Sequence, residues 1–191
     1  MAHRRSKSDE EEEYFKREDA ARLAKIRRDR QIEAVRGAER SLISDALDTD
    51  EALAPEVMDL GFDAATARVL PLVPLIQVAW ADGKITRAED ETVWEKAGEF
   101  GIEKDSPAGE FLGLLLQERP SGIFFERVNR IIQEIVTDSP ESDIATNVLD
   151  WSRAVAKASG SFFGLRNPIG REENNVLKDL ASYFGIDGDK S

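Results

Sequence analysis

A helix–turn–helix pattern occurs twice in this chain of 191 residues, and no other feature constrains the fold as strongly. The first copy reads VAWADGKITRAEDETVWEKAGEFGI and covers 78–102. The second begins as VAKASG at 155–160 and resumes as IGREENNVLKDLASYFGI at 169–186, after a turn that is seven residues longer. Because a repeated unit of this kind buries its apolar face against its neighbour, we expect a bundle built from two pseudo-repeats.

Apolar residues recur at spacings of three and four through most of the chain, and no segment alternates as an amphipathic strand does. Residues such as Gly, Pro, Ser and Asp mark the connections. The pattern predicts helices over about 67–81, 87–100, 106–118, 122–137, 141–158 and 171–184. The predicted fold class is therefore all-α, a compact bundle of about six to seven helices that follows a long charged N-terminal helix.

Several short motifs of the first copy resemble the tellurite-resistance TerB family and its co-chaperone relatives, the DjlA N-terminal-like domains. They are Ala-Asp-Gly-Lys-Ile at 81–85, Glu89, and Phe-Gly-Ile at 100–102. The second copy departs from the family, since Ser159 stands where Asp is common. The resemblance covers about 65–187 and implies a compact helical domain, found in bacterial proteins linked to tellurite and envelope stress. It also implies metal binding through acidic side chains, because Asp82 and Glu89 match the family's acidic positions and Glu173 matches the second of them.

The composition excludes several kinds of active site. The chain has no cysteine, and its single histidine is His3 in the charged N-terminal tail. Disulfides, thiolate zinc sites, cysteine nucleophiles and histidine bases in the folded part are therefore excluded. No pattern positions a nucleophile, an acid and a pocket, so we expect no enzyme. Any metal would be a hard cation such as Mg²⁺, Ca²⁺ or Mn²⁺, bound by oxygen atoms.

Two carboxylates begin the apolar faces of equivalent helices. Glu89 lies four residues before Val93, and Glu173 lies four residues before Leu177. A carboxylate in an apolar setting needs hydrogen bonds, a cation or a proton. One hypothesis is a divalent cation bound by Asp82 and Glu89.

In that hypothesis Glu172, Glu173 or Asp90 would complete the ligand set. The spacing of Gly83 and Glu89 fits an EF-hand loop. A true EF-hand is nevertheless not expected, because Val78 and Trp80 stand where that motif needs oxygen ligands.

The alternative gives the same acidic residues purely structural roles. Thr86 and Glu89 have the spacing of a capping box, and Gly170 with Glu173 offers a weaker version of it. Asp82 would accept backbone N–H groups within its turn, while Gly83 would supply a positive φ. In this hypothesis the chain binds no metal.

The net charge of −12 is unevenly distributed. Residues 1–40 hold 12 Lys/Arg and 10 Asp/Glu, whereas 41–191 hold 14 and 28. An acidic body argues against nucleic acid as a partner.

From the charge distribution and the repeat, we divide the chain into a charged tail and helical arm (1–40, with 1–9 disordered), a connecting segment (41–64), the TerB-like domain (65–187) and a C-terminal tail (188–191).

The arm has two possible roles. It is either a solvated helix or an electrostatic arm that recruits a protein partner through Lys25, Arg27, Arg28 and Arg30.

The longer turn of the second copy, at 161–168, holds two phenylalanines and a leucine that either cover the core or contact a partner. No run of residues has the length and apolarity of a transmembrane segment, and no hydrophobic region follows the Arg pair at 4–5, so we expect a cytoplasmic protein.

Two functions are compatible with these patterns. The first is a non-catalytic TerB-like module that binds a hard cation or a protein partner and is linked to tellurite or envelope stress. The second is a structural adaptor without a metal site, in which acidic residues cap helices and the arm recruits partners. The identity of the partner and the oligomeric state do not follow from the sequence.

Overall fold

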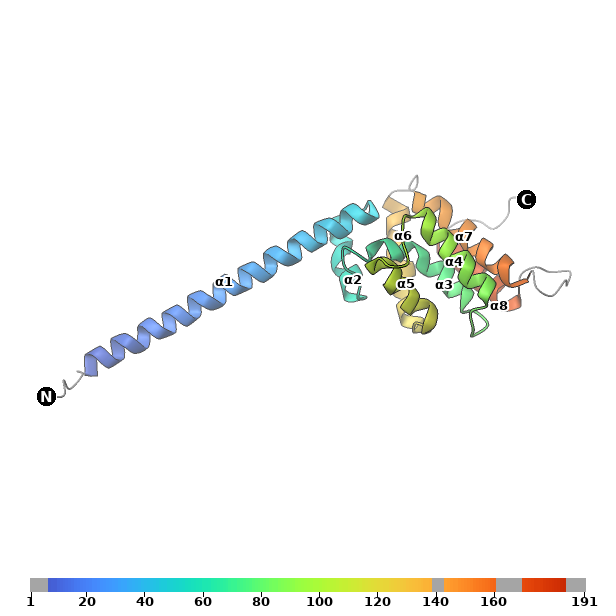
Figure 1. Cartoon of the computed structure of the whole chain (residues 1–191). Coiled ribbons are helices and arrows are strands. Elements are labelled where there is room, and N and C mark those ends of the chain that lie inside the picture. The colour runs from blue at the N-terminus through green and yellow to red at the C-terminus, as the bar shows by residue number, and fades with distance from the viewer. Residues whose placement is uncertain (1–6, 139–142, 161–169, 185–191) are drawn as a thin grey trace. The chain divides into compact units, whose positions relative to one another are not determined.

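All the regular structure in this chain is helical where the computed structural model describes it, that is at residues 7–138, 143–160 and 170–184. The predicted all-α class is therefore confirmed (Figure 1). The longer turn at 161–168 and the tail at 188–191 lie outside the described residues. In chain order the elements are α1 (Lys7–Leu47), the 3₁₀ helix η1 (Glu51–Leu53), α2 (Ala54–Asp59), the 3₁₀ helix η2 (Ala67–Leu72), α3 (Val73–Ala79), α4 (Arg87–Glu99), α5 (Pro107–Gln117), α6 (Gly122–Asp138), α7 (Asp143–Gly160) and α8 (Arg171–Tyr183).

The chain divides into two units, Met1–Arg40 and Ser41–Ser191, and α1 begins in the first and ends in the second. In the first unit, hereafter the arm, the helix is rich in Glu, Lys, Arg and Ala, which favour helix intrinsically. Ion pairs one turn apart add support, at 3.0 Å between Lys16 and Glu12. The helix already includes 7–9, so the prediction of disorder is wrong for those three residues.

The second unit, hereafter the body, begins well before the predicted domain start at residue 65. Residues 41–64, expected to connect the arm to the domain, contribute to the core. Their buried apolar side chains are Ile43, Leu47, Leu53, Ala54, Val57 and Phe62. This segment is therefore part of the body's hydrophobic core.

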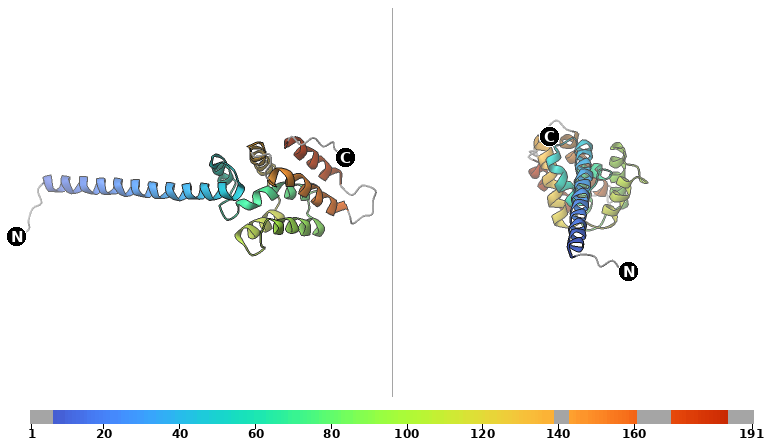
Figure 2. Two further views of the ribbon diagram at one scale, coloured as in Figure 1. Left: turned by 90° about the horizontal axis from the view of Figure 1, so that it is seen from above. Right: turned by 90° about the vertical axis from the view of Figure 1, so that its left-hand side faces the viewer.

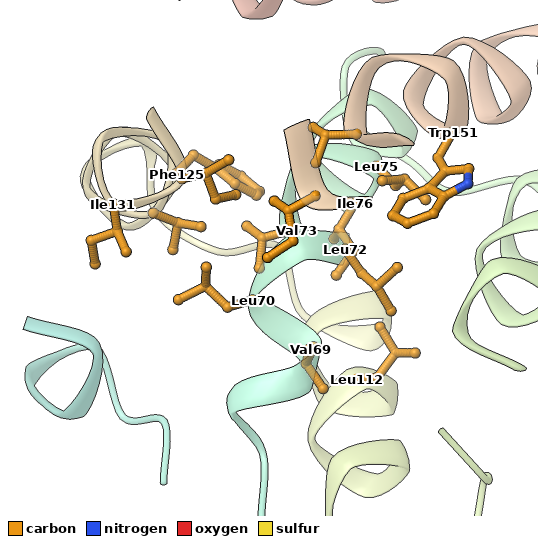
Figure 3. Close-up of a cluster of buried hydrophobic side chains, with 14 of the residues drawn as sticks. Val69, Leu70, Leu72, Val73, Leu75, Ile76, Leu112, Phe125, Ile131 and Trp151 are labelled. Carbon is orange, nitrogen blue, oxygen red and sulfur yellow. The ribbon is translucent and has the colours of Figure 1, made fainter. Parts of the chain in front are cut away.

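The apolar segment at 67–81 lies at the centre of the body, but it is not one helix. It forms η2 and then α3, which ends at Ala79. Proline has no N–H to donate, so Pro71 and Pro74 interrupt the hydrogen bonds of a continuous α-helix, and Pro74 is tolerated in the first turn of α3. Figure 3 shows the result: side chains of η2 and α3 point toward Trp151 of α7 on one side and Phe125 of α6 on the other.

The two helices that follow the repeated turns are equivalent in length and position. α4 and α8 have 13 residues each, and their ends correspond residue for residue in the aligned copies. Each N-cap has an extended backbone, Thr86 at ψ 162° and Gly170 at ψ 164°. The C-cap of each helix is a phenylalanine, Phe100 or Phe184.

The two hairpins of the repeat, α3–α4 and α7–α8, pack directly on each other. Helix α7 contacts α3, α4 and α8, and α3 also contacts α8 (Figure 2). The Trp151 indole on α7 and the Phe100 ring at the end of α4 pack in a T-shaped arrangement, with ring centres 4.7 Å apart. The duplicated sequence therefore forms the contiguous part of the body on which the candidate residues lie.

Candidate functional site

The turn of the first copy is closed by the acidic residue that the sequence offered as a metal ligand. The Asp82 carboxylate accepts the backbone N–H of Lys84, with Oδ1 and N 3.1 Å apart. Gly83 between them has φ 90°, the left-handed conformation that glycine adopts without steric cost. Asp82 and Lys84 are exposed. The predicted structural roles of Asp82 and Gly83 in the turn are confirmed.

The predicted capping box at the start of α4 is present with both of its hydrogen bonds. The Thr86 N–H donates to Oε2 of Glu89 at 2.6 Å, and the Glu89 N–H donates to the Thr86 hydroxyl oxygen at 3.3 Å. The Glu89 carboxylate also lies in the first turn of α4, where the helix dipole favours negative charge. One carboxylate oxygen of Glu89 is thus already engaged by the backbone.

Glu89 is almost fully buried, with 1% of its surface exposed, and this environment opposes its ionisation. Burial raises the pKa of the Glu89 carboxyl, and hydrogen bonding to the backbone and the side chain of Thr86 lowers it. The negative charges of Asp82 and Glu173 raise the pKa further. The pKa of Glu89 is therefore raised by an acidic residue of each copy, Asp82 of the first and Glu173 of the second, in addition to burial.

Glu173 occupies the corresponding position in the second copy and is also buried, with 5% exposed. Its N-cap is Gly170, which has no side chain to donate or accept a hydrogen bond. A Cβ atom at position 170 would lie 1.8 Å from Oε2 of Glu173, so the carboxylate folds back over the N-cap into space that only glycine leaves open. Gly170 thus allows Glu173 to approach the N-terminus of α8.

The four predicted ligand residues differ in their exposure. Glu89 and Glu173 are buried and interact through their charges, whereas Asp82 and Glu172 are exposed. Across the described residues, no group of three or more Asp, Glu, His or Cys side chains is placed to hold a metal ion. The geometry consists of two buried carboxylates at two helix N-termini, each close to its own N-cap.

A polar pair with one buried and one half-buried member, on α6 and α3, was not singled out from the sequence. The Asn129 side-chain amide on α6 donates to Oε1 of Gln77 on α3 at 2.9 Å. The Asn129 Oδ1 atom is buried and has no hydrogen-bond partner in the described part of the chain. The sequence feature that could have indicated this pair is Gln77, the one polar residue in the apolar run from 69 to 81.

A shallow groove of about 440 Å³ opens elsewhere on the body and contains none of the four predicted residues. Small apolar side chains and backbone form most of its lining, and Asp45 and Arg68 supply its charges. It lies between the last turns of α1, the segment before η2, and the loop that leads into α5. The groove and the acidic residues are thus separate features.

Comparison of the chain with protein-family models, with curated proteins and with solved structures finds no match in any of the three. Among the described helices, none combines the length and the apolar composition needed to cross a bilayer.

Proposed function

We propose that this protein is a non-catalytic helical adaptor, in which the body is a stable platform and the arm recruits a protein partner. The observation that carries the proposal is the surface of the arm. Large apolar side chains are exposed on it, including Phe15 at 61%, Leu23 at 54% and Val35 at 69%. A helix that leaves such residues in water, among many charges, is suited to docking.

The cationic stretch of the arm strengthens this proposal. Lys25, Arg27, Arg28 and Arg30 are exposed, and none of them makes an ion pair with a residue that the structure describes. Elsewhere on the same helix, charges are paired, as between Arg40 and Glu33 at 2.7 Å. Unpaired cations are available to a partner with acidic groups.

The acidic residues of the body support the same proposal, because they already have structural roles. Asp82 closes a turn and Glu89 caps a helix. Neither role requires a metal. In this function the carboxylates stabilise the platform and do not form its binding site.

The arm is tested by affinity capture from cells that express the tagged full chain. The variant replaces Lys25, Arg27, Arg28 and Arg30 by Gln, and the matched control replaces four exposed body cations, Arg68, Lys84, Arg119 and Lys178, by Gln. We expect proteins that bind the wild type and the control but are lost with the arm variant. An unchanged set of captured proteins contradicts the adaptor function.

A second candidate function is a TerB-like module that binds Mg²⁺, Ca²⁺ or Mn²⁺ and acts in tellurite or envelope stress. The observation that favours it is the buried pair of like charges, since a cation near Glu89 and Glu173 would relieve their repulsion. The test follows tryptophan emission and the thermal midpoint while each cation is titrated. Trp80 and Trp94, which flank the Asp82 turn, report on this region.

A cation that binds only the folded state raises the midpoint as its concentration rises. The variants are Asp82→Asn and Glu89→Gln, with exposed Glu91→Gln as the control. Stabilisation that both variants lose and the control keeps establishes the cation site. No response of either signal at millimolar metal eliminates it and leaves the adaptor function.

A further inference from the structure

One face of the arm carries an alternating set of apolar and charged residues. Phe15, Asp19, Arg22 and Ile26 follow one another at spacings of four, three and four, so they lie on the same side of the helix. Phe15 and Ile26 are 61% and 40% exposed. This set of four residues is hereafter called the arm face, and Leu23, 54% exposed, lies at its edge.

The charges on and beside this face are available, although partners of opposite sign lie one turn away. Glu18, Asp19, Arg22 and Lys25 are all exposed, and none of them makes an ion pair with a described residue. By contrast, Lys16 and Arg17 pair with acidic residues four positions earlier. The free charges therefore occupy the middle of the arm, between the two apolar residues of the face.

The order of these residues distinguishes between two directions of self-pairing. In a parallel pair, equivalent residues meet, so Asp19 would oppose Asp19 and Arg22 would oppose Arg22. In an antiparallel pair centred between residues 20 and 21, Asp19 opposes Arg22 of the second copy, and Phe15 opposes Ile26. Each contact then occurs twice by symmetry. Apolar residues meet in both arrangements, but opposite charges are matched only in the antiparallel one.

Charges that flank the face fit the same arrangement. Glu18 of one copy lies beside Lys25 of the other, again twice. At the two ends Glu12 opposes Asp29, a like-charge contact that limits close pairing to residues 15–26. We propose that the arm binds the arm of a second copy of this chain, antiparallel over residues 15–26. This inference goes beyond the proposed adaptor function, because it concerns a contact between two copies of this chain.

The pairing is weak by its size. About 12 residues from each chain take part, far fewer than the 20–30 residues a side of a standard interface. Two apolar residues per copy on the face, with Leu23 at its edge, supply little burial. We therefore expect a dimer that forms and dissociates with concentration, and whose affinity falls as salt screens its charges.

The test is sedimentation velocity of the full chain over a concentration series, with charge reversals at the centre of the face. Asp19→Arg brings two basic residues together across the pair, and Arg22→Asp brings two acidic residues together, so each variant alone should be monomeric. An equimolar mixture of the two restores both opposite-charge contacts and should dimerise as the wild type does. Arg17→Asp makes the same charge change on the opposite side of the helix, within the paired stretch, and should leave the dimer in place.

The direction of pairing is tested with single cysteines, which the cysteine-free chain permits. Glu18→Cys and Lys25→Cys proteins are mixed and oxidised, and the disulfides are identified by mass spectrometry. Antiparallel arms give mainly the mixed 18–25 disulfide, whereas equivalent positions are too far apart to join.

Two results overturn the inference. The first is a wild-type chain that is monomeric at every concentration and yields no mixed disulfide, including a chain whose arm binds anionic vesicles or nucleic acid. The second is self-association that neither charge reversal weakens. Either result leaves the adaptor function to its own test, because capture of another protein through the arm cations does not depend on arm–arm pairing.

Discussion

Helices α4 and α8 are copies with the same length and the same cap positions, but they are stabilised differently. At matched positions both bury a glutamate and an apolar residue one turn later, Val93 or Leu177. They differ three residues further on. Leu180 of α8 is buried at 1% exposure, while the matching residue of α4 is Lys96.

The difference follows from the neighbours of each helix. α8 contacts α3, α6 and α7, and Leu180 belongs to the buried core. α4 contacts α3, α7 and η2. The Lys96 ammonium forms an ion pair with the Glu99 carboxylate of the same helix, at 2.7 Å. The N-caps differ as well. The Thr86 hydroxyl accepts a hydrogen bond from the Glu89 N–H, whereas Gly170 has no side chain with which to cap α8. The two copies thus share a buried glutamate with an apolar residue one turn later, and they differ at positions 96 and 180.

The largest expected effect is at the position where the copies differ most. Leu180→Ala should lower the free energy of unfolding by about 2–5 kcal/mol, because it removes a fully buried side chain and leaves a cavity. The matched Lys96→Ala change in α4 should cost less, about 1 kcal/mol for the ion pair with Glu99 together with the packing of a side chain that is 18% exposed. Urea unfolding measures both. Equal losses would show that the two helices are packed alike.

The next effect concerns the capping carboxylate of α4. Glu89→Ala should cost about 1–3 kcal/mol, because it leaves the Thr86 N–H without its acceptor in a half-buried site. Glu89→Gln keeps an acceptor oxygen and removes the buried charge, so its loss should be clearly smaller. Thermal and urea unfolding distinguish them. A glutamine variant as unstable as the alanine variant would mean that the charge itself is required.

The caps of the two copies should respond to different changes. Thr86→Ala should cost about 1 kcal/mol, whereas Thr86→Ser keeps the hydroxyl and should be nearly neutral. Gly170→Ala should also destabilise the protein, because its Cβ would displace the Glu173 carboxylate from its present position. Unfolding free energies of the three variants test this. A neutral Gly170→Ala change would mean that the approach of Glu173 to its N-cap contributes little.

The smallest effect is the dependence of stability on pH that Glu89 contributes. Its pKa is raised above the ordinary 4.5 by burial, so the folded protein favours the neutral form. Below 4.5 both the folded and unfolded states are protonated, and above the folded-state pKa both are ionised. The contribution of Glu89 to the unfolding free energy is therefore lost as the pH rises through that interval.

The measurement is urea unfolding of wild type and Glu89→Gln from about pH 4 to 8, the range over which a raised carboxyl pKa acts. The wild-type value minus the glutamine value should fall with rising pH and then level off. A difference that grows with pH would mean that a cation or an unrecognised positive charge stabilises ionised Glu89.

The sequence was sufficient wherever the interacting groups are close along the chain. Thr86 and Glu89 are three residues apart, and the Asp82 turn closes within two, so both follow from local spacing. The bounds of α4 and α8 were predicted to within about one residue, because caps and an apolar stripe mark both ends. The exception was the segment with two prolines, where a 3₁₀ helix replaced half of the predicted helix.

The amino-acid sequence alone therefore determined the helical class and the duplication, and it offered the capping role of Glu89 as one of two hypotheses, since each depends on contacts within a few positions. Tertiary packing alone decided that Glu173 raises the pKa of Glu89, that Asn129 meets Gln77, and that residues 41–64 belong to the core. Those outcomes join residues far apart in the chain, and the period of a helix does not specify which neighbour its buried face will meet.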